Sequence, residues 1–213
     1  MARLLLPGRI RVWERGERGV NSAASEAYTP SLLEGGRMLR GERVVLRPIE
    51  RQDVERLWEV LEDLEVAHRV SNSPPILWSR ARWEAEVEAW AEEPDDATVR
   101  FVIEVDGEVI GQCQLDKLDH YRGLCDLGIS LGRAYWGQGH GQDAVHTLVG
   151  YAFRYLNMRK VCLEVLADDE RAVGAYKKVG FVEEGRLRQQ AWFDGDYADA
   201  LVMALFRDEW RKA

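Results

Sequence analysis

Cysteine and histidine are scarce in this chain, and their scarcity argues against two kinds of site. Three cysteines and four histidines occur among 213 residues, with no Cys-x-x-Cys pair and no histidines at metal-ligand spacing. An odd number of cysteines in apolar, strand-like surroundings is typical of buried free thiols. We therefore expect neither a disulfide framework nor a metal site.

Long apolar runs are also missing. No stretch approaches the length of a membrane span. The segment "ARLLLPG" near the start is too short for the apolar region of a secretory signal. Apolar residues make up 46% of the chain and charged residues 31%, which is ordinary for a globular protein in water. The composition predicts a cytoplasmic protein with no membrane partner.

Positive charge is in short supply. The chain has 29 Lys and Arg against 37 Asp and Glu, a formal net charge of −8. Residues 1–37 carry more arginine than glutamate, so the acidic excess lies in the remainder. An acidic body disfavours nucleic acid as a partner and is compatible with cationic substrates such as amines.

The first 37 residues read differently from the rest. They contain five glycines, and the stretch "NSAASEAYTPS" has no hydrophobic period. We expect an irregular N-terminal arm over residues 1–37, with residues 8–13 as a candidate short strand, followed by one domain over residues 38–213. Met38 is a candidate natural start.

Hydrophobic periodicity from Arg43 onward predicts seven strands and four helices. The strands are expected at 43–49, 98–105, 108–115, 124–131, 160–166, 185–193 and 197–206, and the helices around 54–64, 83–91, 144–156 and 169–179. The pairs Asp106-Gly107 and Asp194-Gly195 are typical of two-residue hairpin turns. Helices within a run of hairpins predict a mixed sheet with one parallel crossover.

A glycine-rich segment precedes the third predicted helix. Gly137, Gly139 and Gly141 alternate there with Gln138 and His140. Glycine costs backbone entropy, and the usual gain is close approach of a ligand to bare N–H groups. At a helix N-terminus such a ligand is favoured when it is an anion. The pattern predicts a phosphate site, and a tight turn without ligand is the alternative.

Two familiar phosphate motifs do not explain this segment. The Walker string G-x-x-x-x-G-K-[ST] does not occur. Gly139, Gly141 and Ala144 fit the Rossmann pattern G-x-G-x-x-A, but that pattern follows its strand directly. Here "GRAYWGQ" intervenes, and the strands upstream form a meander.

Two linked motifs resemble those of the GNAT superfamily of N-acetyltransferases. The string "WGQGHG" corresponds to [RQ]-x-x-G-x-[GA], with Trp136 where Arg or Gln often stands. The string "DERAVGAYKKVGF" matches N-x-R-A-x-x-x-Y-x-K-x-G-F, except that Asp169 replaces Asn. The tail "EGRLRQQAWFDGDYADALVMALFRDEW" is similar to the branch that acetylates ribosomal-protein N-termini at alanine or serine. The resemblance covers roughly Met38 to Trp210.

The resemblance implies an α/β (α+β) fold. Its mixed, mostly antiparallel twisted sheet would have about seven strands with four helices, and its central parallel strands would splay around acetyl-CoA. The implied activity is direct transfer of an acetyl group from acetyl-CoA to a primary amine, without an acyl-enzyme. We expect a protein N-terminal α-amine first, and a small amine or amine-bearing antibiotic second. A non-catalytic coenzyme A-binding regulatory module is the alternative, and a homodimer is a candidate assembly.

The resemblance also implies the residues that hold the coenzyme. The pyrophosphate would lie on the segment formed by Trp136, Gly137, Gln138, Gly139, His140 and Gly141. The pantetheine arm would pair with the strand edge from Ile129 to Leu131. Asp169 either contacts the pantetheine, as the family's Asn does, or caps the following helix. Arg171 belongs to the same motif.

Tyr176 is the general acid that the resemblance implies. A phenol with a reference pKa near 10 can reprotonate a departing thiolate of pKa near 8.5. The spacing of Tyr176 with Ala172 and Val179 also fits a residue that faces the core. The oxyanion donor is expected to be a backbone N–H near Ile129, where the family's fourth strand is bulged.

The general base depends on the acceptor. Neutralising a side-chain amine of pKa ~10.4 at pH 7 costs ~4.6 kcal/mol, whereas an α-amine of pKa ~7.7–8.0 costs only ~1–1.4 kcal/mol. A side-chain amine therefore needs a base and an α-amine scarcely does. Asp126 is the first candidate, acting through water. The alternative is that Asp126 is a solvated strand carboxylate without a catalytic role. Asp116, Asp119 and His120 are weaker candidates.

Overall fold

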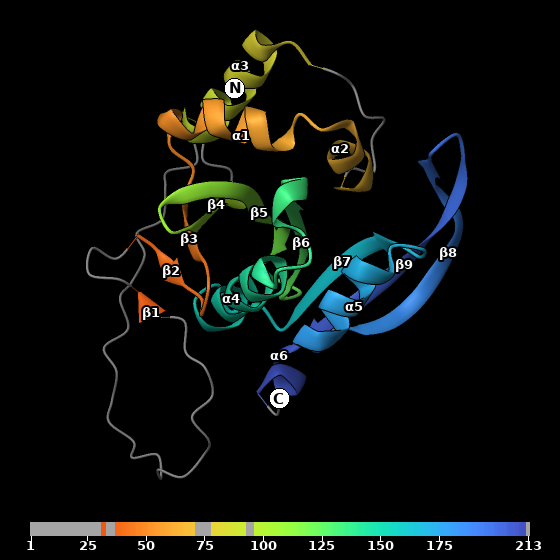
Figure 1. Ribbon diagram of the computed structural model, residues 1–213. Coiled ribbons are helices and arrows are strands. Elements are labelled where there is room, and N and C mark those ends of the chain that lie inside the picture. Colours follow the sequence, from red (N-terminus) through yellow and green to blue (C-terminus); the bar gives the residue numbers. More distant parts are fainter. Residues whose placement is uncertain (1–30, 33–36, 71–77, 93–95, 212–213) are drawn as a thin grey trace, which may run out of the picture.

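The computed structural model describes residues 31–32, 37–70, 78–92 and 96–211, and within them a single sheet runs through the molecule (Figure 1). The spatial order of its nine strands is β1-β2-β3-β4-β5-β6-β7-β9-β8. Neighbouring strands are antiparallel except for β6 and β7. The predicted mixed, mostly antiparallel sheet is confirmed.

The elements have the following bounds. The strands are β1 (Ser31–Leu32), β2 (Leu39–Arg40), β3 (Val45–Pro48), β4 (Val99–Val105), β5 (Glu108–Asp119), β6 (Leu124–Leu131), β7 (Lys160–Leu166), β8 (Val182–Phe193) and β9 (Asp196–Phe206). The α-helices are α1 (Val54–Leu61), α2 (Leu64–Val70), α3 (Arg80–Glu92), α4 (His140–Arg154), α5 (Glu170–Val179) and α6 (Arg207–Trp210). Two 3-10 turns, η1 (Arg51–Asp53) and η2 (Arg133–Tyr135), complete the set.

The counts of seven strands and four helices were too low for the described residues. The sequence patterns did not indicate the short strands β1 and β2, the helices α2 and α6, or the start of β8 at Val182. β1 lies within the predicted N-terminal arm and pairs with β2. The candidate strand at residues 8–13 lies outside the described residues, and the boundary at residue 38 stays a prediction.

The helix predicted over residues 54–64 is two helices. The first helix ends at its C-cap, Glu62. Asp63 begins the second, because its Oδ1 accepts hydrogen bonds from the backbone N–H of Glu65 at 2.8 Å and of Val66 at 3.4 Å. An aspartate that satisfies the free amides of a first turn starts a helix. The pKa of Asp63 is lowered chiefly by its hydrogen bond with Arg133, and then by these amides.

Both predicted hairpin turns are confirmed. Asp106 and Gly107 have φ angles of 51° and 83°, and Asp194 and Gly195 have 50° and 85°. Left-handed conformation at both central residues is the geometry of the turn that matches strand twist, and it favours the Asp-Gly pair. The second turn closes the long β8–β9 hairpin, which extends beyond α5 in Figure 1.

Helices cover both faces of the sheet. Ile103 belongs to the main core with Ala144 and Leu148 of α4, whereas Val102 packs in a second cluster with Leu57 of α1. Successive strand side chains point to opposite faces, so β4 contributes to both cores. Among the described residues, no helix is both long enough and apolar enough to cross a membrane.

The two parallel strands separate soon after they meet. They pair from Leu124↔Lys160 to Asp126↔Cys162, and no further pair joins their described residues, although β6 continues to Leu131 and β7 to Leu166. The divergence leaves a V between two arms of the molecule, visible in Figure 1 between β6 and β7. The splayed parallel strands that the resemblance implies are confirmed.

Candidate active site

A cleft of about 550 Å³ opens between the splayed strands. Its walls come from β5, β6, β7, α2, α4, α5 and the β8–β9 hairpin. Eight of the predicted site residues line it: Asp126, Ile129, Leu131, Trp136, Gly141, Asp169, Arg171 and Tyr176. The structure thus brings together residues from both GNAT-like motifs, which are more than 25 positions apart in the chain.

The glycine loop lies at the rim of the cleft. Gly137, Gln138, Gly139 and His140 are not in its lining, but the residues on either side of them are. Gly137 and Gly139 have φ angles of 73° and 88°, which side chains rarely tolerate, and Gly139 is the N-cap of α4. The segment from Gly137 to Gly139 is exposed. Its free amides and the helix dipole therefore face a position that an anion can reach.

An arginine that no sequence motif marks lies beside this loop. Arg43, next to β3, donates from Nη1 to the carbonyl oxygen of Gln138 at 3.3 Å. The carboxylate of Asp143, in the first turn of α4, accepts from the backbone N–H groups of Glu42, Arg43 and Val44. These contacts hold the segment 42–44 against α4 and bring the Arg43 guanidinium to the glycine loop, so the loop offers a cation to a phosphate.

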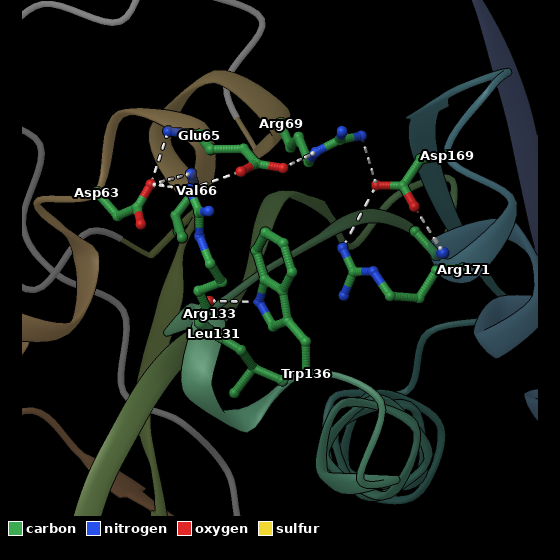
Figure 2. Close-up of polar contacts among 10 residues, drawn as sticks. Asp63, Glu65, Val66, Arg69, Leu131, Arg133, Trp136, Asp169 and Arg171 are labelled. Atoms are coloured by element: carbon green, nitrogen blue, oxygen red, sulfur yellow. Dashed lines mark hydrogen bonds and ion pairs between the residues drawn. The ribbon is translucent and has the colours of Figure 1, made fainter.

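Trp136 and Arg171 form one wall of the cleft (Figure 2). The indole N–H of Trp136 donates to the carbonyl oxygen of Leu131 at 2.7 Å, which fixes the ring. The guanidinium of Arg171 lies over that ring, 4.0 Å from its centroid. The tryptophan that departs from the family pattern thus serves as a platform that holds a cation at the cleft.

Asp169 caps α5 and pairs with two arginines. Its Oδ1 accepts from the backbone N–H of Ala172 at 3.0 Å, so the capping role left open by the sequence is observed. Its Oδ2 lies 3.4 Å from Arg171 Nη2 and 3.5 Å from Nη1 of Arg69, which belongs to α2. The side chain of Asp169 is only 8% exposed, and a charge so buried is found paired. No sequence pattern marks Arg69, because its partner lies 100 residues away.

Tyr176 faces the cleft while its ring rests against the core. It lines the cleft, and its ring meets that of Phe181 with centroids 5.9 Å apart. Of its helix face, Val173 and Val179 are buried in the core, whereas Ala172 joins Tyr176 in the cleft wall. Burial raises the pKa of Tyr176 to about 12, and the charge of Asp169 adds to the rise. The phenol therefore keeps its proton across the physiological range.

The candidate bases separate into two groups. Asp126 and Asp116 line the cleft from neighbouring strands, directly opposite each other in the β5–β6 register. Lys117 Nζ lies 2.7 Å from Asp126 Oδ2. Asp119 and His120 are outside the cleft, at the β5–β6 turn, where Asp119 accepts from Arg122. The structure thus places only the first pair where an acceptor could meet them.

The bulge expected near Ile129 is not there. Pairing between β5 and β6 runs without a shift from Gly111↔Leu131 to Asp116↔Asp126, and the irregularity falls between Asp116 and Asp119. Lys117 lies within this irregularity and has a left-handed φ of 51°. The edge of β6 is instead freed by its divergence from β7. The backbone from Leu127 to Leu131 has a strand neighbour on one side and the cleft on the other.

The chemistry of these residues is compatible with coenzyme A. The open strand edge can pair with an amide-rich arm, and the rim supplies bare amides and the cation of Arg43 for a pyrophosphate. His140 Nδ1 is buried at this rim and has no hydrogen-bond partner among the described residues. A buried polar atom without a partner is typical of a site that a ligand completes.

The chain belongs to the GNAT acetyltransferases, because residues 43–182 match the family described as "Acetyltransferase (GNAT) domain". It is an acetyl-CoA-dependent N-acetyltransferase. A spermidine N(1)-acetyltransferase of Escherichia coli strain K12 is 31% identical over 173 residues, which is 78% of this chain and 88% of that protein.

Two solved structures share the fold. Spermidine N-acetyltransferase from Vibrio cholerae, in complex with CoA and spermine, has a TM-score of 0.72 at 24% identity and covers 79% of this chain and 98% of its own. RimJ of Mycobacterium smegmatis, in complex with CoA-disulfide, has a TM-score of 0.71 at 22% identity and covers 81% and 86%. At these identities the likeness concerns the fold alone.

We expect Gly139→Val to weaken coenzyme A binding by well over tenfold. Valine cannot adopt a φ of 88° without strain, and its methyl groups would press on the Arg43 guanidinium, which lies 3.8 Å from the position of a Cβ. Isothermal calorimetry with coenzyme A measures the loss. Gly174→Ala is the control, because a Cβ there meets nothing within 4 Å. Unchanged affinity in a folded Gly139→Val protein would remove the loop from the site.

Proposed function

We propose that this protein acetylates a small polycationic amine of the spermidine class, with acetyl-CoA as the donor. The observation that carries the proposal is a set of three carboxylates in the cleft wall, one on each of three adjacent strands: Asp116 on β5, Asp126 on β6 and Glu164 on β7. Similarity to spermidine N(1)-acetyltransferase supports it. The protein N-terminus, ranked first from the sequence, becomes the second candidate.

Lys117 indicates what an ammonium group encounters in this wall. Its pKa is raised first by the hydrogen bond with Asp126, then by the charges of Asp126, Glu164 and Asp116. All three carboxylates therefore stabilise one cation in the same place. The side chain of Lys117 is 81% exposed and can move aside for an ammonium of the substrate.

Four cleft side chains and the free edge of β6 have roles in the proposed reaction. Acetyl-CoA supplies an acyl carbon already activated as a thioester. Asp126 accepts a proton through water from the ammonium of the acceptor, and the neutral amine that results attacks the thioester carbon. A backbone N–H on the free edge of β6 stabilises the developing oxyanion, and the second proton that the nitrogen loses replaces the one that the departing sulfur takes up. Tyr176 donates a proton to the departing sulfur, and Glu164 and Asp116 hold the other ammonium groups of the acceptor.

Direct transfer agrees with the state of the cleft cysteine. Cys162 is the cysteine in the cleft lining, and burial is the main cause that raises its pKa. A thiol needs a lowered pKa to act as a nucleophile at neutral pH. Its environment therefore does not favour an acyl-enzyme, which supports attack by the amine on the bound thioester.

The proposal predicts that spermidine exceeds an alanine- or serine-starting peptide in kcat/KM by at least tenfold. In the same assay Glu164→Gln should raise the KM for spermidine by about two- to fivefold with little change in kcat, because an exposed ion pair contributes up to about 1 kcal/mol. Glu183→Gln, an equal charge change on the exposed face of β8, should leave both constants unchanged. A preference for the peptide, or equal effects of the two variants, contradicts the proposal.

A further inference from the structure

A closed circuit of contacts joins the two arms of the V through helix α2. On the β6 side, Arg133 Nη2 lies 3.0 Å from Asp63 Oδ1 and 2.5 Å from Glu65 Oε2. On the α5 side, Arg69 of the same helix reaches Asp169. Figure 2 shows both ends. The circuit is completed by Arg171, which lies over the ring of Trp136, and by the bond from Trp136 to Leu131.

Arg69 is where the elements around the cleft meet. Its Nε lies 3.4 Å from Glu65 on its own helix, and its Nη1 lies 3.5 Å from Asp169 at the N-cap of α5. Its guanidinium also lies over the ring of Phe193, 4.9 Å from the centroid, beside the Asp194-Gly195 turn. One side chain therefore contacts α2, the second GNAT-like motif and the β8–β9 hairpin.

The contact with Asp169 follows from the departure from the family pattern. An asparagine at this position would cap α5 as well and would carry no charge. The aspartate adds a charge that is 8% exposed, and Arg69, at 25% exposure, is one of the two cations that balance it. The Asp and the Arg thus act as a pair that fastens α2 to the wall against which the pantetheine arm would lie.

We propose that Arg69 is a positioning residue that couples coenzyme binding to the acceptor side of the cleft. A pantetheine arm bound between β6 and α5 restricts the motion of Asp169. Because Arg69 contacts Asp169, α2 and Phe193 of the hairpin, α2 and the hairpin are restricted as well. The two ends of the cleft are then ordered together. This coupling rests on the established acetyl-CoA-dependent activity and does not depend on which amine is the acceptor.

The direct test is hydrogen exchange of the α2 amides, with coenzyme A alone as the probe. In the wild-type protein, saturating coenzyme A should slow exchange in residues 64–70 by at least about fivefold, the lower end of usual couplings between sites. Arg69→Gln should lose this protection while α4 keeps its own. Arg80→Gln is the control, because Arg80 of α3 pairs with Glu84 on its own helix and with Glu55 on α1, and is outside the cleft lining.

A second variant approaches the pair from the other side. Asp169→Asn keeps the helix cap and removes the charge, so it should lose the same protection of the α2 amides. In the double variant with Arg69→Gln, the loss of protection should be little larger than in either single variant. Protection of α2 equal to wild type in Arg69→Gln, or no protection in the wild-type protein, would overturn the proposal. Additive losses in the double variant would also overturn it, because the two residues would then act separately.

Kinetics distinguish positioning from loss of structure. With spermidine as the acceptor, Arg69→Gln should raise the acceptor KM several-fold more than the acetyl-CoA KM, and Arg69→Lys should recover part of the loss. Equal rises in both KM values would indicate general loosening and contradict positioning. If spermidine is not acetylated by the wild-type protein, the polyamine proposal fails, while the exchange experiment still decides the role of Arg69.

Discussion

Replacing Tyr176 by phenylalanine is expected to lower kcat by about 10²–10⁴, the usual range for a positioned general acid. The ring keeps its contact with Phe181 and its place against the core, and no hydrogen bond to its hydroxyl occurs among the described residues. Folding stability should therefore change by less than about 1 kcal/mol. The KM for acetyl-CoA should move far less than kcat, because the lost interaction is made mainly in the transition state.

Tyr151→Phe is the matched control for this variant. Tyr151 is a second partly buried tyrosine whose pKa is raised by burial, but it lies on α4 against Phe101 and Tyr155, outside the cleft lining. The Tyr151→Phe variant should leave kcat unchanged. A Tyr176→Phe protein with near wild-type kcat, measured where chemistry limits the rate, would assign the proton to water and Tyr176 to the core.

Burial also fixes how Tyr176 depends on pH. Its pKa of about 12 lies above the value near 10 of an unfolded chain, so the folded state holds the proton more tightly. The stability that this group contributes is complete below about pH 10 and is lost as pH rises towards 12. The acid form is thus present at every pH at which the enzyme would be assayed. The pKa of Tyr176 therefore lies further above that of the departing thiol, near 8.5, than the reference phenol value of about 10 does.

The sequence predicted what short-range patterns determine. The Asp-Gly turns follow from two adjacent residues, and the start of α4 follows from glycines that must adopt left-handed angles. The two motifs predicted one cleft because family resemblance carries information about distant contacts. Residues chosen on that ground, such as Trp136 and Asp169, do line one cleft.

What the sequence could not predict depends on partners about 100 residues apart. Arg43 meets the glycine loop and Asp143 only through the fold, and Arg69 meets Asp169 in the same way. No local pattern marks these arginines among the many others in the chain. The start of α2 did have a signal, since Asp63 precedes Leu64 as a helix cap. However, the apolar spacing continues through Leu64 and therefore predicted one helix over residues 54–64.

Asp126→Asn is expected to lower kcat with spermidine by about 10²-fold at pH 7. Asp126 is the last residue of β6 that pairs with β7, so it lies at the vertex of the V, where the two strands part. Without a base the rate follows the neutral fraction of an amine of pKa ~10.4 and should rise about tenfold per pH unit between pH 7 and 9. The wild-type rate should be nearly flat over that range. Asp119→Asn makes the same chemical change outside the cleft and should have no effect. Parallel pH profiles for Asp126→Asn and wild type would assign proton removal to another group.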